Sequence, residues 1–578
     1  MQNTRPWHHH YAHVPHSIEY PRVTLYEYLS QTIDHRPDKI AWEFLGTQCT
    51  YQEFSRFIDQ CANALTGLGL KKGDAITIAM PTCPQGIICF YAANKIGAVA
   101  SMIHPLSTES EINFYLGLSH SRLALTLDAF YDKFAAAMED TPCEQLILAK
   151  IGDFLSPLKR WGFWATKGRK IPPVPKDSRV FFWKETMEKS WPPQEKVPMD
   201  PEETAVILYS GGTTGRPKGI LLSNMNFIAE GMMVASWGNL DHTDTILAIL
   251  PIFHGFGLGV CVNAAFMGGA KTILVPQFTP ETVAKLIRKK QPSCIVGVPT
   301  LYAALCKNKD FKRANLLCLK AAFCGADSLP GPVKEKFETI VKNQGGNVKL
   351  LEGYGLTEAV TAIMAMPLNS YREKSIGIPF PDMDAKIVIP DTLDTAPHGE
   401  DGELCLSGPA VMKGYLNQRE ETAKTLRIHG DGKTWLHTGD IASRDEEGFF
   451  YFKLRQKRMI KSSGMNVYPV QVEDHLYQHP KVAEACVIGV PDPDQVERVK
   501  AFVVKAPGVD TPDEKLEKEL IRHCQKKLIK WSCPRSVEFR SQLPTTLVGK
   551  VAFKVLEKEE IQRLRRAGKY TGDKGDRP

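Results

Sequence analysis

The most informative segment of the chain is Tyr209-Ser210-Gly211-Gly212-Thr213-Thr214-Gly215-Arg216-Pro217-Lys218-Gly219. Apolar runs flank it at 205–208 and 220–222, and each run predicts a buried strand. Small and hydroxyl residues in a row cannot build a core, but their N–H groups can wrap a phosphate chain. Lys218 adds a mobile charge for the outer phosphates. A flexible hairpin loop is the alternative, and the paired threonines with the Gly-x-Pro-Lys-Gly ending favour phosphate binding instead.

This loop differs from the two commonest nucleotide-binding loops. The spacing G-x-x-x-x-G-K-[ST] is absent, because Arg216 and Pro217 separate Gly215 from Lys218. A G-x-G-x-x-G fingerprint that opens a helix is absent from the sequence as well. The phosphate-binding prediction therefore needs support from other segments.

Further motifs follow the loop in order along the chain. They are Leu250-Pro251-Ile252-Phe253-His254-Gly255-Phe256-Gly257, Glu352-Gly353-Tyr354-Gly355-Leu356-Thr357-Glu358, Leu436-His437-Thr438-Gly439-Asp440 and Pro544-Thr545-Thr546-Leu547-Val548-Gly549-Lys550. Together with the loop they resemble the adenylate-forming superfamily of acyl- and aryl-CoA synthetases, firefly-type luciferases and peptide-synthetase adenylation domains. The resemblance runs from about Tyr26 to about Glu560. It is strongest to bacterial medium- and long-chain fatty acyl-CoA synthetases, through residues 7–21, 300–305 and 463–469.

Length and composition bound the class of protein. A chain of 578 residues exceeds the usual size of one domain, so we expect two or more. Hydrophobic content of 43% and charged content of 24% are typical of a globular protein. The net charge of +7 suits a site for ATP and CoA, although surplus surface lysines would give the same value. No dense basic block indicates a nucleic-acid partner.

Cysteine usage and apolar segments predict the compartment. The 14 cysteines form no C-x-x-C pair, which argues against structural zinc and against a disulfide framework and favours a reducing compartment. Residues 1–10 contain no apolar stretch typical of a signal peptide. Residues 246–270 lack charged side chains, but Pro251 and several glycines predict a strand, a turn and a short helix rather than a membrane span. We expect a cytoplasmic protein, with peripheral contact on the inner face of the membrane as an alternative.

The pattern of elements predicts an α/β fold. The first 200 residues alternate strands with helices, such as a strand at 75–80 and a helix at 86–96, which is typical of α/β layers. We expect a large N-terminal adenylation domain of layered α/β subdomains at 1–453 and a hinge at 454–457. A small mobile α+β lid should follow at 458–578, with helices near 470–478 and 513–528 and strands at 483–490 and 499–505.

The resemblance implies which residues bind ATP and Mg²⁺. The phosphates would contact Ser210, Gly211, Gly212, Thr213, Thr214, Gly215 and Lys218, and the base would contact Gly325, Ala326, Asp327, Glu352, Gly353, Tyr354 and Gly355. Asp440 would reach the ribose, and Arg455 would reach the ribose or the α-phosphate. Thr213 with Glu358 would hold Mg²⁺ through oxygen ligands. Two structural alternatives stay open: Glu358 could cap a surface helix, and Asp440 could be a turn residue after Gly439.

Catalysis follows from the poor reactivity of a carboxylate. Coupling the acid to AMP makes a mixed anhydride that a thiol can attack, and both steps develop negative charge that cations and N–H donors stabilise. The resemblance implies that Lys550 bridges the carboxylate and the α-phosphate and that Thr357 is a further catalytic residue. His254 would gate the acyl pocket or orient the carboxylate. A structural role for His254 is the alternative. Lys457 would be the hinge residue whose motion brings Ser463 and Gly464 toward CoA.

The acid pocket is expected between 227–237, 254–262 and 297–302. These segments are largely apolar, and Gly255, Gly257 and Gly259 are expected to leave room, which favours an apolar acid. Chain length cannot be deduced, since one methylene changes binding by only about 1–3 kcal/mol. The alternatives are an aryl-CoA ligase, an acyl-AMP ligase that loads a separate carrier protein, and a non-catalytic binding protein. Oligomeric state stays open, with a dimer among the options.

One segment mixes aromatic residues with cations. It runs from Pro157 to Trp164 and continues with Lys167, Arg169 and Lys170. Such a pattern is typical of a helix that rests on a bilayer, where fatty acids partition. An insertion packed on its own domain explains the same composition, so both interpretations stay open.

Overall fold

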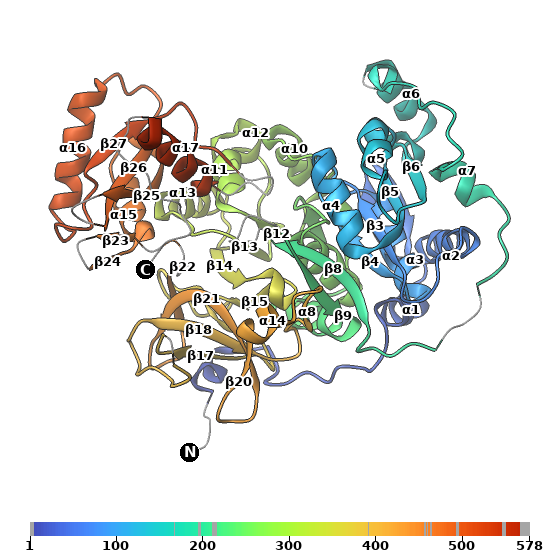
Figure 1. The fold of residues 1–578 in the computed structure, drawn as a ribbon, viewed down its shortest axis with the longest axis horizontal. Coiled ribbons are helices and arrows are strands. Elements are labelled where there is room, and N and C mark those ends of the chain that lie inside the picture. The colour runs from blue at the N-terminus through green and yellow to red at the C-terminus, as the bar shows by residue number, and fades with distance from the viewer. Residues whose placement is uncertain are drawn as a thin grey trace.

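The computed structural model describes residues 5–166, 168–194, 198–210, 217–390, 392–455, 458, 460–462, 465–492, 496–545 and 551–566. Figure 1 shows a molecule with the C-terminal elements at one end of its long axis and α6 (Pro157–Thr166) toward the other. The fold is α/β, with a large N-terminal part and a smaller C-terminal part, as the sequence predicts.

The first sheet contains both strands that flank the glycine-rich loop. Its order is β19 (Gly414–Tyr415), β9 (Lys218–Ser223), β8 (Thr204–Ser210), β4 (Val99–Met102), β3 (Ala75–Ala79), β5 (Ser121–Leu127), β6 (Gln145–Ala149) and β7 (Val180–Phe182). The strands from β8 to β7 pair in parallel. The associated helices are α2 (Tyr51–Gly67), α3 (Pro84–Lys95), α4 (Glu109–Ser119), α5 (Tyr131–Ala137) and α7 (Trp183–Glu188).

The second sheet carries two of the other motifs. Its order is β16 (Ile378–Pro379), β15 (Ala362–Ala365), β14 (Leu350–Gly355), β13 (Ala321–Cys324), β12 (Cys294–Gly297), β10 (Thr245–Ala248), β11 (Lys271–Leu274), β1 (Ile40–Phe44) and β2 (Thr47–Thr50). The uncharged segment 246–270 forms β10, the π-helix η5 (Phe256–Asn263) and α9 (Ala264–Met267). Among the described residues, no helix is long and apolar enough to cross a membrane. The helices of this region are α1 (Leu25–His35), α8 (Asn224–Trp237), α10 (Pro280–Lys290), α11 (Pro299–Lys307), α12 (Lys309–Lys312) and α13 (Gly331–Lys342).

A third sheet completes the N-terminal part. Its order is β17 (Asp384–Val388), β18 (Gly402–Ser407), β21 (Thr434–Arg444) and β20 (Leu426–Ile428), with β22 (Phe450–Arg455) paired to β21 and α14 (Arg419–Thr425) nearby. One apolar core extends from Trp7 to Phe450 and includes residues of all three sheets. The N-terminal segment belongs to it, because the Tyr11 hydroxyl donates to the carbonyl of Pro379 at 2.7 Å.

The C-terminal part has cores of its own. Its sheet consists of β24 (Met465–Val467), β23 (Ile460–Ser462), β26 (Val496–Lys505) and β25 (Val482–Asp492), with β27 (Ser536–Phe539) paired to β26. The helices are α15 (Pro469–Tyr477), α16 (Asp513–Gln525) and α17 (Phe553–Arg566). Leu454 and Arg455, at the start of the predicted hinge, pair with β21 as part of β22. Gln456 and Lys457 lie outside the described residues, so the hinge stays a prediction.

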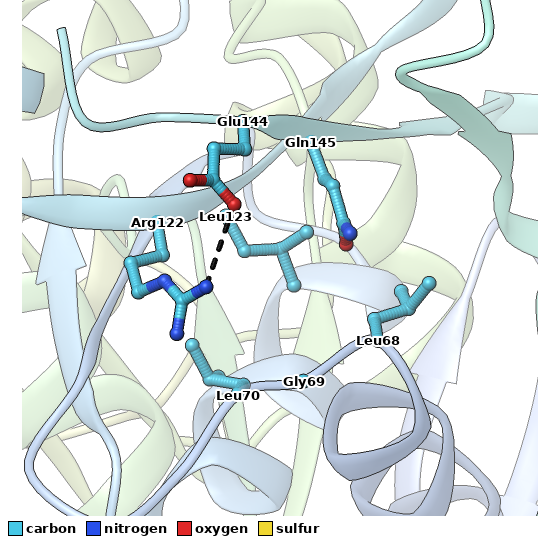
Figure 2. Close-up of a pocket in the computed structure, with 7 residues that line it drawn as sticks. All are labelled: Leu68, Gly69, Leu70, Arg122, Leu123, Glu144 and Gln145. Atoms are coloured by element: carbon cyan, nitrogen blue, oxygen red, sulfur yellow. Dashed lines mark hydrogen bonds and ion pairs between the residues drawn. The ribbon is translucent and has the colours of Figure 1, made fainter.

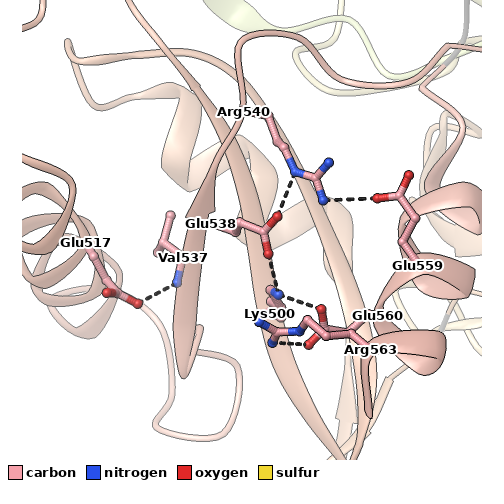
Figure 3. Close-up of polar contacts among 8 residues, drawn as sticks. All are labelled: Lys500, Glu517, Val537, Glu538, Arg540, Glu559, Glu560 and Arg563. Atoms are coloured by element: carbon pink, nitrogen blue, oxygen red, sulfur yellow. Dashed lines mark hydrogen bonds and ion pairs between the residues drawn. The ribbon is translucent and has the colours of Figure 1, made fainter. Parts of the chain in front are cut away.

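A buried lysine ties α17 to the C-terminal sheet, as Figure 3 shows. Lys500 on β26 is 2% exposed, and its Nζ lies 2.7 Å from carboxylate oxygens of both Glu538 and Glu560. Arg563 and Arg540 complete the charges around these two carboxylates. A buried charge is tolerated only when it is paired, so this network holds α17 in a defined position. Lys550 lies in the chain between β27 and α17, outside the described residues.

Candidate active site

The two ends of the glycine-rich loop lie side by side. Strand β8 ends at Ser210 and β9 begins at Lys218, and these two residues are paired opposite each other. Gly211, Gly212, Thr213, Thr214 and Gly215 lie outside the described residues. The Lys218 ammonium contacts the Glu421 carboxylate of α14 and lies 4.6 Å from the centre of the Tyr415 ring. Lys218, at the end of the loop, is thus held by Glu421 and Tyr415, which the sequence analysis missed.

Tyr415 also reaches the predicted metal-binding residue. Its hydroxyl donates to Glu358 Oε1 at 3.0 Å. Burial, and then the Glu358 carboxylate, raise the pKa of Tyr415, so the hydroxyl stays protonated and continues to donate. Glu358 lies in the short helix η6 (Thr357–Ala359) together with the predicted catalytic residue Thr357, which is buried. Tyr415 therefore links the lysine predicted to bind the phosphates to the carboxylate predicted to bind Mg²⁺.

The donor set fits the predicted cation. A carboxylate beside hydroxyl and backbone oxygens is what a hard cation such as Mg²⁺ requires. Glu358 provides that carboxylate in η6, which contacts β8, whereas Thr213 lies outside the described residues. The assignment of Thr213 and Glu358 as ligands stays a prediction.

The predicted contacts for base and ribose come together. The Tyr354 hydroxyl on β14 donates to Asp440 Oδ2 on β21 at 2.7 Å, and Asp440 is 1% exposed. Arg455 lies opposite Asp440 in the β21–β22 pairing, although its side chain lies outside the described atoms. Asp440 is not a turn residue, because β21 continues through it to Arg444. Two distant motifs thus form one polar cluster, which is the central observation at this site.

A hydrogen-bonded chain positions Asp440. Gly439 has a φ of +68°, a left-handed conformation that favours glycine, and its N–H donates to Glu403 Oε1 at 2.9 Å. Glu403 Oε2 lies 2.7 Å from His437 Nδ1, and His437 Nε2 lies 2.9 Å from His429 Nε2. Burial lowers the pKa of His429, so this ring is neutral. Of the residues that support Asp440 in this way, Gly439 and His437 belong to the motif, whereas Glu403 and His429 carried no sequence signal.

The same chain contains ligand-type atoms close enough to hold a metal. One atom each of Glu403, Cys405 and His437 lies within 4.8 Å of the others. Both Glu403 oxygens, however, already face donors on Gly439 and His437. Burial, and then the Glu403 carboxylate, raise the pKa of Cys405, which keeps the thiol protonated, whereas a metal binds the thiolate. We therefore interpret the cluster as a support for the strand that carries Asp440.

The remaining residues predicted near the base lie at the ends of two neighbouring strands. Gly325, Ala326 and Asp327 follow β13, and a Cβ on Gly325 would lie 3.1 Å from the carbonyl oxygen of Gly353. On β14, a Cβ on Gly355 would lie 1.5 Å from the carbonyl oxygen of Thr361, so only glycine fits. Glu352 accepts from the Tyr371 hydroxyl at 3.0 Å, and burial raises the pKa of its carboxyl group. Roles for these residues toward the base stay predictions, as does the role of Ser463 and Gly464, which lie outside the described residues.

The glycines near His254 do not leave room, which corrects the sequence expectation. A Cβ on Gly255 would lie 2.0 Å from the Val360 oxygen, and a Cβ on Gly257 would lie 2.1 Å from the Pro251 oxygen. These glycines allow η5 to approach its neighbours closely. His254 Nδ1 accepts from the N–H of Phe256 at 3.2 Å, at the start of this π-helix. π-Helical segments are frequent at functional sites, yet the role of His254 stays a prediction.

The predicted pocket wall on α8 divides into two faces. Phe227 and Glu230 are fully buried. Met232, Ala235 and Ser236 instead line a groove of about 440 Å³ beneath the N-terminal segment. A different pocket, between the end of α2 and strands β5 and β6, is drawn in Figure 2. Its volume of about 10 Å³ is too small for an acid substrate, and the Arg122–Glu144 ion pair lies beside it.

Glu230 is a fully buried acid that the sequence analysis did not single out. Its Oε2 lies 2.8 Å from where a Cβ on Gly259 would be. Neither carboxyl oxygen meets hydrogen-bonding geometry with a described donor, although the backbone N–H of Ala362 partly offsets the effect of burial. Burial raises the pKa of Glu230 well above its ordinary value, so the group is neutral in the folded protein.

The Glu230→Gln variant is expected to be more stable than the wild type at neutral and alkaline pH. The unfolded chain releases the Glu230 proton near pH 4.3, whereas the folded chain retains it. Stability is therefore lost as pH rises from the unfolded pKa toward the folded pKa. Thermal unfolding at about pH 5 and about pH 8 measures the effect, and the gain should be larger at the higher pH. The matched control is Glu335→Gln on the exposed side of α13, and equal destabilisation by Glu230→Gln at both pH values would contradict the prediction.

Family models match most of this architecture. The model described as AMP-binding enzyme matches residues 29–416, and the model described as AMP-binding enzyme C-terminal domain matches residues 471–550. This chain belongs to the AMP-binding enzyme family. The membership confirms the resemblance to adenylate-forming enzymes on which the sequence analysis relied.

Two relatives of this family member differ in the acids that their names contain. A long-chain-fatty-acid–CoA ligase of Bacillus subtilis (strain 168) is 35% identical over 569 residues, which cover 97% of this chain and 99% of the relative. A feruloyl-CoA synthase of Amycolatopsis sp. is 32% identical over 508 residues, which cover 88% of this chain and 93% of the relative.

Solved structures share the fold of this AMP-binding enzyme. ATP-bound MatB from Rhodopseudomonas palustris superposes with a TM-score of 0.81 at 24% identity, covering 93% of this chain and 99% of the other. The anthranilate CoA ligase AuaEII, in complex with anthranoyl-AMP, superposes with a TM-score of 0.82 at 24% identity, covering 94% and 98%. At this identity the likeness establishes the fold alone.

Proposed function

We propose that this protein is an AMP-forming ligase that activates a long-chain fatty acid with ATP and transfers the acyl group to CoA. The observation that carries the proposal is the contact of the Tyr354 hydroxyl with Asp440 Oδ2 at 2.7 Å, which joins the residue predicted to contact the base to the residue predicted to contact the ribose. The Lys218–Tyr415–Glu358 cluster adds a cation and a carboxylate where the phosphates and their metal would lie. A long-chain fatty acid as the substrate is supported by the Bacillus relative, whose similarity extends over 97% of this chain.

The chemistry assigns a task to each group. Asp440 accepts hydrogen bonds from the ribose hydroxyls, while Lys218 leaves Glu421 for the phosphates. Mg²⁺, held by Thr213 and Glu358, would neutralise phosphate charge. Lys550 holds the acid so that its oxygen attacks the α-phosphorus and the bond to pyrophosphate breaks. The CoA sulfur then attacks the acyl carbon, AMP leaves, and the thiol proton is released to solvent.

An aryl acid is the second candidate substrate. The feruloyl-CoA synthase of Amycolatopsis sp. is 32% identical to this chain over 88% of its length. This similarity favours an aryl acid as the alternative to a long aliphatic chain.

A panel of acids distinguishes these candidates. Pyrophosphate release is measured with ATP, Mg²⁺, CoA and acids from acetate through ferulate to palmitate. The proposal predicts that kcat/KM is highest for long aliphatic chains and that turnover requires CoA. A maximum at ferulate would move the substrate to aryl acids, and release that ignores CoA would indicate a carrier-protein acceptor. No pyrophosphate release with any acid would contradict the proposed ligase activity.

The proposal includes peripheral contact with the inner face of the membrane. Long-chain acids partition into bilayers, so an enzyme that collects them gains from working at that surface. The cytoplasm supplies the ATP and CoA that the reaction consumes.

A further inference from the structure

Helix α6 presents its apolar side to solvent. Leu158, Trp161 and Trp164 are 80%, 66% and 59% exposed, and their spacing places them along one side of the helix. In a helix that packs on its own domain, such residues face the core. In Figure 1, α6 lies at the margin of the N-terminal part, beyond α5 and β6.

The opposite side of α6 fastens the helix to the protein. Arg160 Nε donates to the carbonyl of Gly152 at 3.0 Å, and Lys159 Nζ donates to the carbonyl of Leu45 at 2.6 Å. Phe163 packs against the main apolar core. These contacts set the orientation of α6. Its tryptophans are therefore exposed on a helix that is anchored to the protein.

The charged residues of the segment 157–170 all have one sign. From Pro157 to Lys170 the sequence contains Lys159, Arg160, Lys167, Arg169 and Lys170 and no acidic residue. Arg169 and Lys170 are exposed in the short helix η4 (Gly168–Lys170) directly after α6. Exposed tryptophans beside cations complement the interface of an anionic bilayer, where the rings lie at headgroup level and the cations meet lipid phosphates.

We propose that α6 and η4 form a membrane-binding surface that inserts Leu158, Trp161 and Trp164 into an anionic bilayer. The benefit of such binding to the enzyme rests on the proposed function, because long-chain acids are concentrated in a bilayer. Apolar insertion and charge attraction together are the two signals that stable, reversible peripheral binding needs. The contact is made by the N-terminal part, so the C-terminal part stays away from the lipid in this arrangement.

The test measures vesicle binding by the full-length protein without ATP, CoA or acid. Flotation compares vesicles of phosphatidylglycerol and phosphatidylcholine with vesicles of phosphatidylcholine alone. We expect binding to the anionic vesicles that weakens with salt, and a loss of about tenfold or more in the double variant Trp161→Ser/Trp164→Ser. Arg169→Glu/Lys170→Glu should also weaken binding. The matched control is Trp531→Ser, an exposed tryptophan of the C-terminal part, which should bind like the wild type.

Several outcomes would overturn the proposal. They are failure of the wild type to bind anionic vesicles, equal binding by the Trp161/Trp164 variant, and binding that does not distinguish the two lipid compositions. Loss of a dimer in that variant, without any vesicle binding, would assign the surface to a second copy of the chain. Because the mutated side chains are exposed, thermal unfolding should not change. Turnover of a short soluble acid is measured in parallel, so failure of the ligase proposal is seen separately.

Discussion

Replacing Lys550 by alanine is expected to lower acyl-adenylate formation by about 10²- to 10³-fold, the usual effect of removing one group that stabilises charge in the transition state. The expectation rests on the motif at 544–550, since Lys550 lies outside the described residues. Pyrophosphate release under saturating ATP and acid measures the first step. Thioester formation from supplied acyl-AMP measures the second step, and it should remain close to wild type because the proposed role of Lys550 is confined to acyl-adenylate formation.

The control for Lys550 is the nearby Lys554→Ala. Lys554 is exposed at the start of α17, and its removal should leave both steps unchanged. An equal loss of both steps in Lys550→Ala would contradict a role confined to adenylation. It would point instead to a disturbed C-terminal part, which the Lys500 network holds in place.

Replacing Asp440 by alanine is expected to weaken ATP binding and turnover by about 10- to 100-fold. A hydrogen bond to a charged group contributes about 1.5–3 kcal/mol, and the partly buried Tyr354 hydroxyl also loses its acceptor. Calorimetry of AMP binding and kcat/KM for ATP measure the loss. Tyr354→Phe should have a smaller effect, since the carboxylate that we propose accepts from the ribose remains.

A second Tyr–Asp pair provides the matched control. The Tyr451 hydroxyl donates to Asp445 Oδ2 at 2.8 Å, just beyond the end of β21. Asp445→Ala removes a similar contact away from the Tyr354–Asp440 cluster and should leave AMP affinity unchanged. Equal loss of affinity in both aspartate variants would show that damage to the third sheet, rather than loss of a ribose contact, explains the effect.

Much of the site could be predicted because its signals are local. The apolar runs around the glycine-rich loop predict β8 and β9, and the structure has strands there. The order of the motifs indicates the family, which the match over residues 29–416 confirms. Periodicity also predicted α15 and α16 within a few residues of where the structure places them.

Contacts between distant segments could not be predicted. Nothing near Lys218 in the chain indicates that Glu421 and Tyr415 would hold it, because β19 joins β9 only through sheet pairing. The glycines at 255 and 257 were expected to give space, but a missing side chain equally allows a backbone to come close. Sequence patterns cannot distinguish open space from a close backbone contact, since the neighbouring atoms come from other segments.

By itself the sequence determined the α/β class, the family, and the residue types available for ATP chemistry, because strand periodicity and motif spacing are properties of short segments. Only the tertiary structure decided that Tyr354 meets Asp440, that Glu230 is buried without a described hydrogen-bond donor, and that α6 turns its tryptophans outward. Periodicity shows that a helix has an apolar side. Which way that side faces depends on what the opposite side binds, here the carbonyl groups of Gly152 and Leu45.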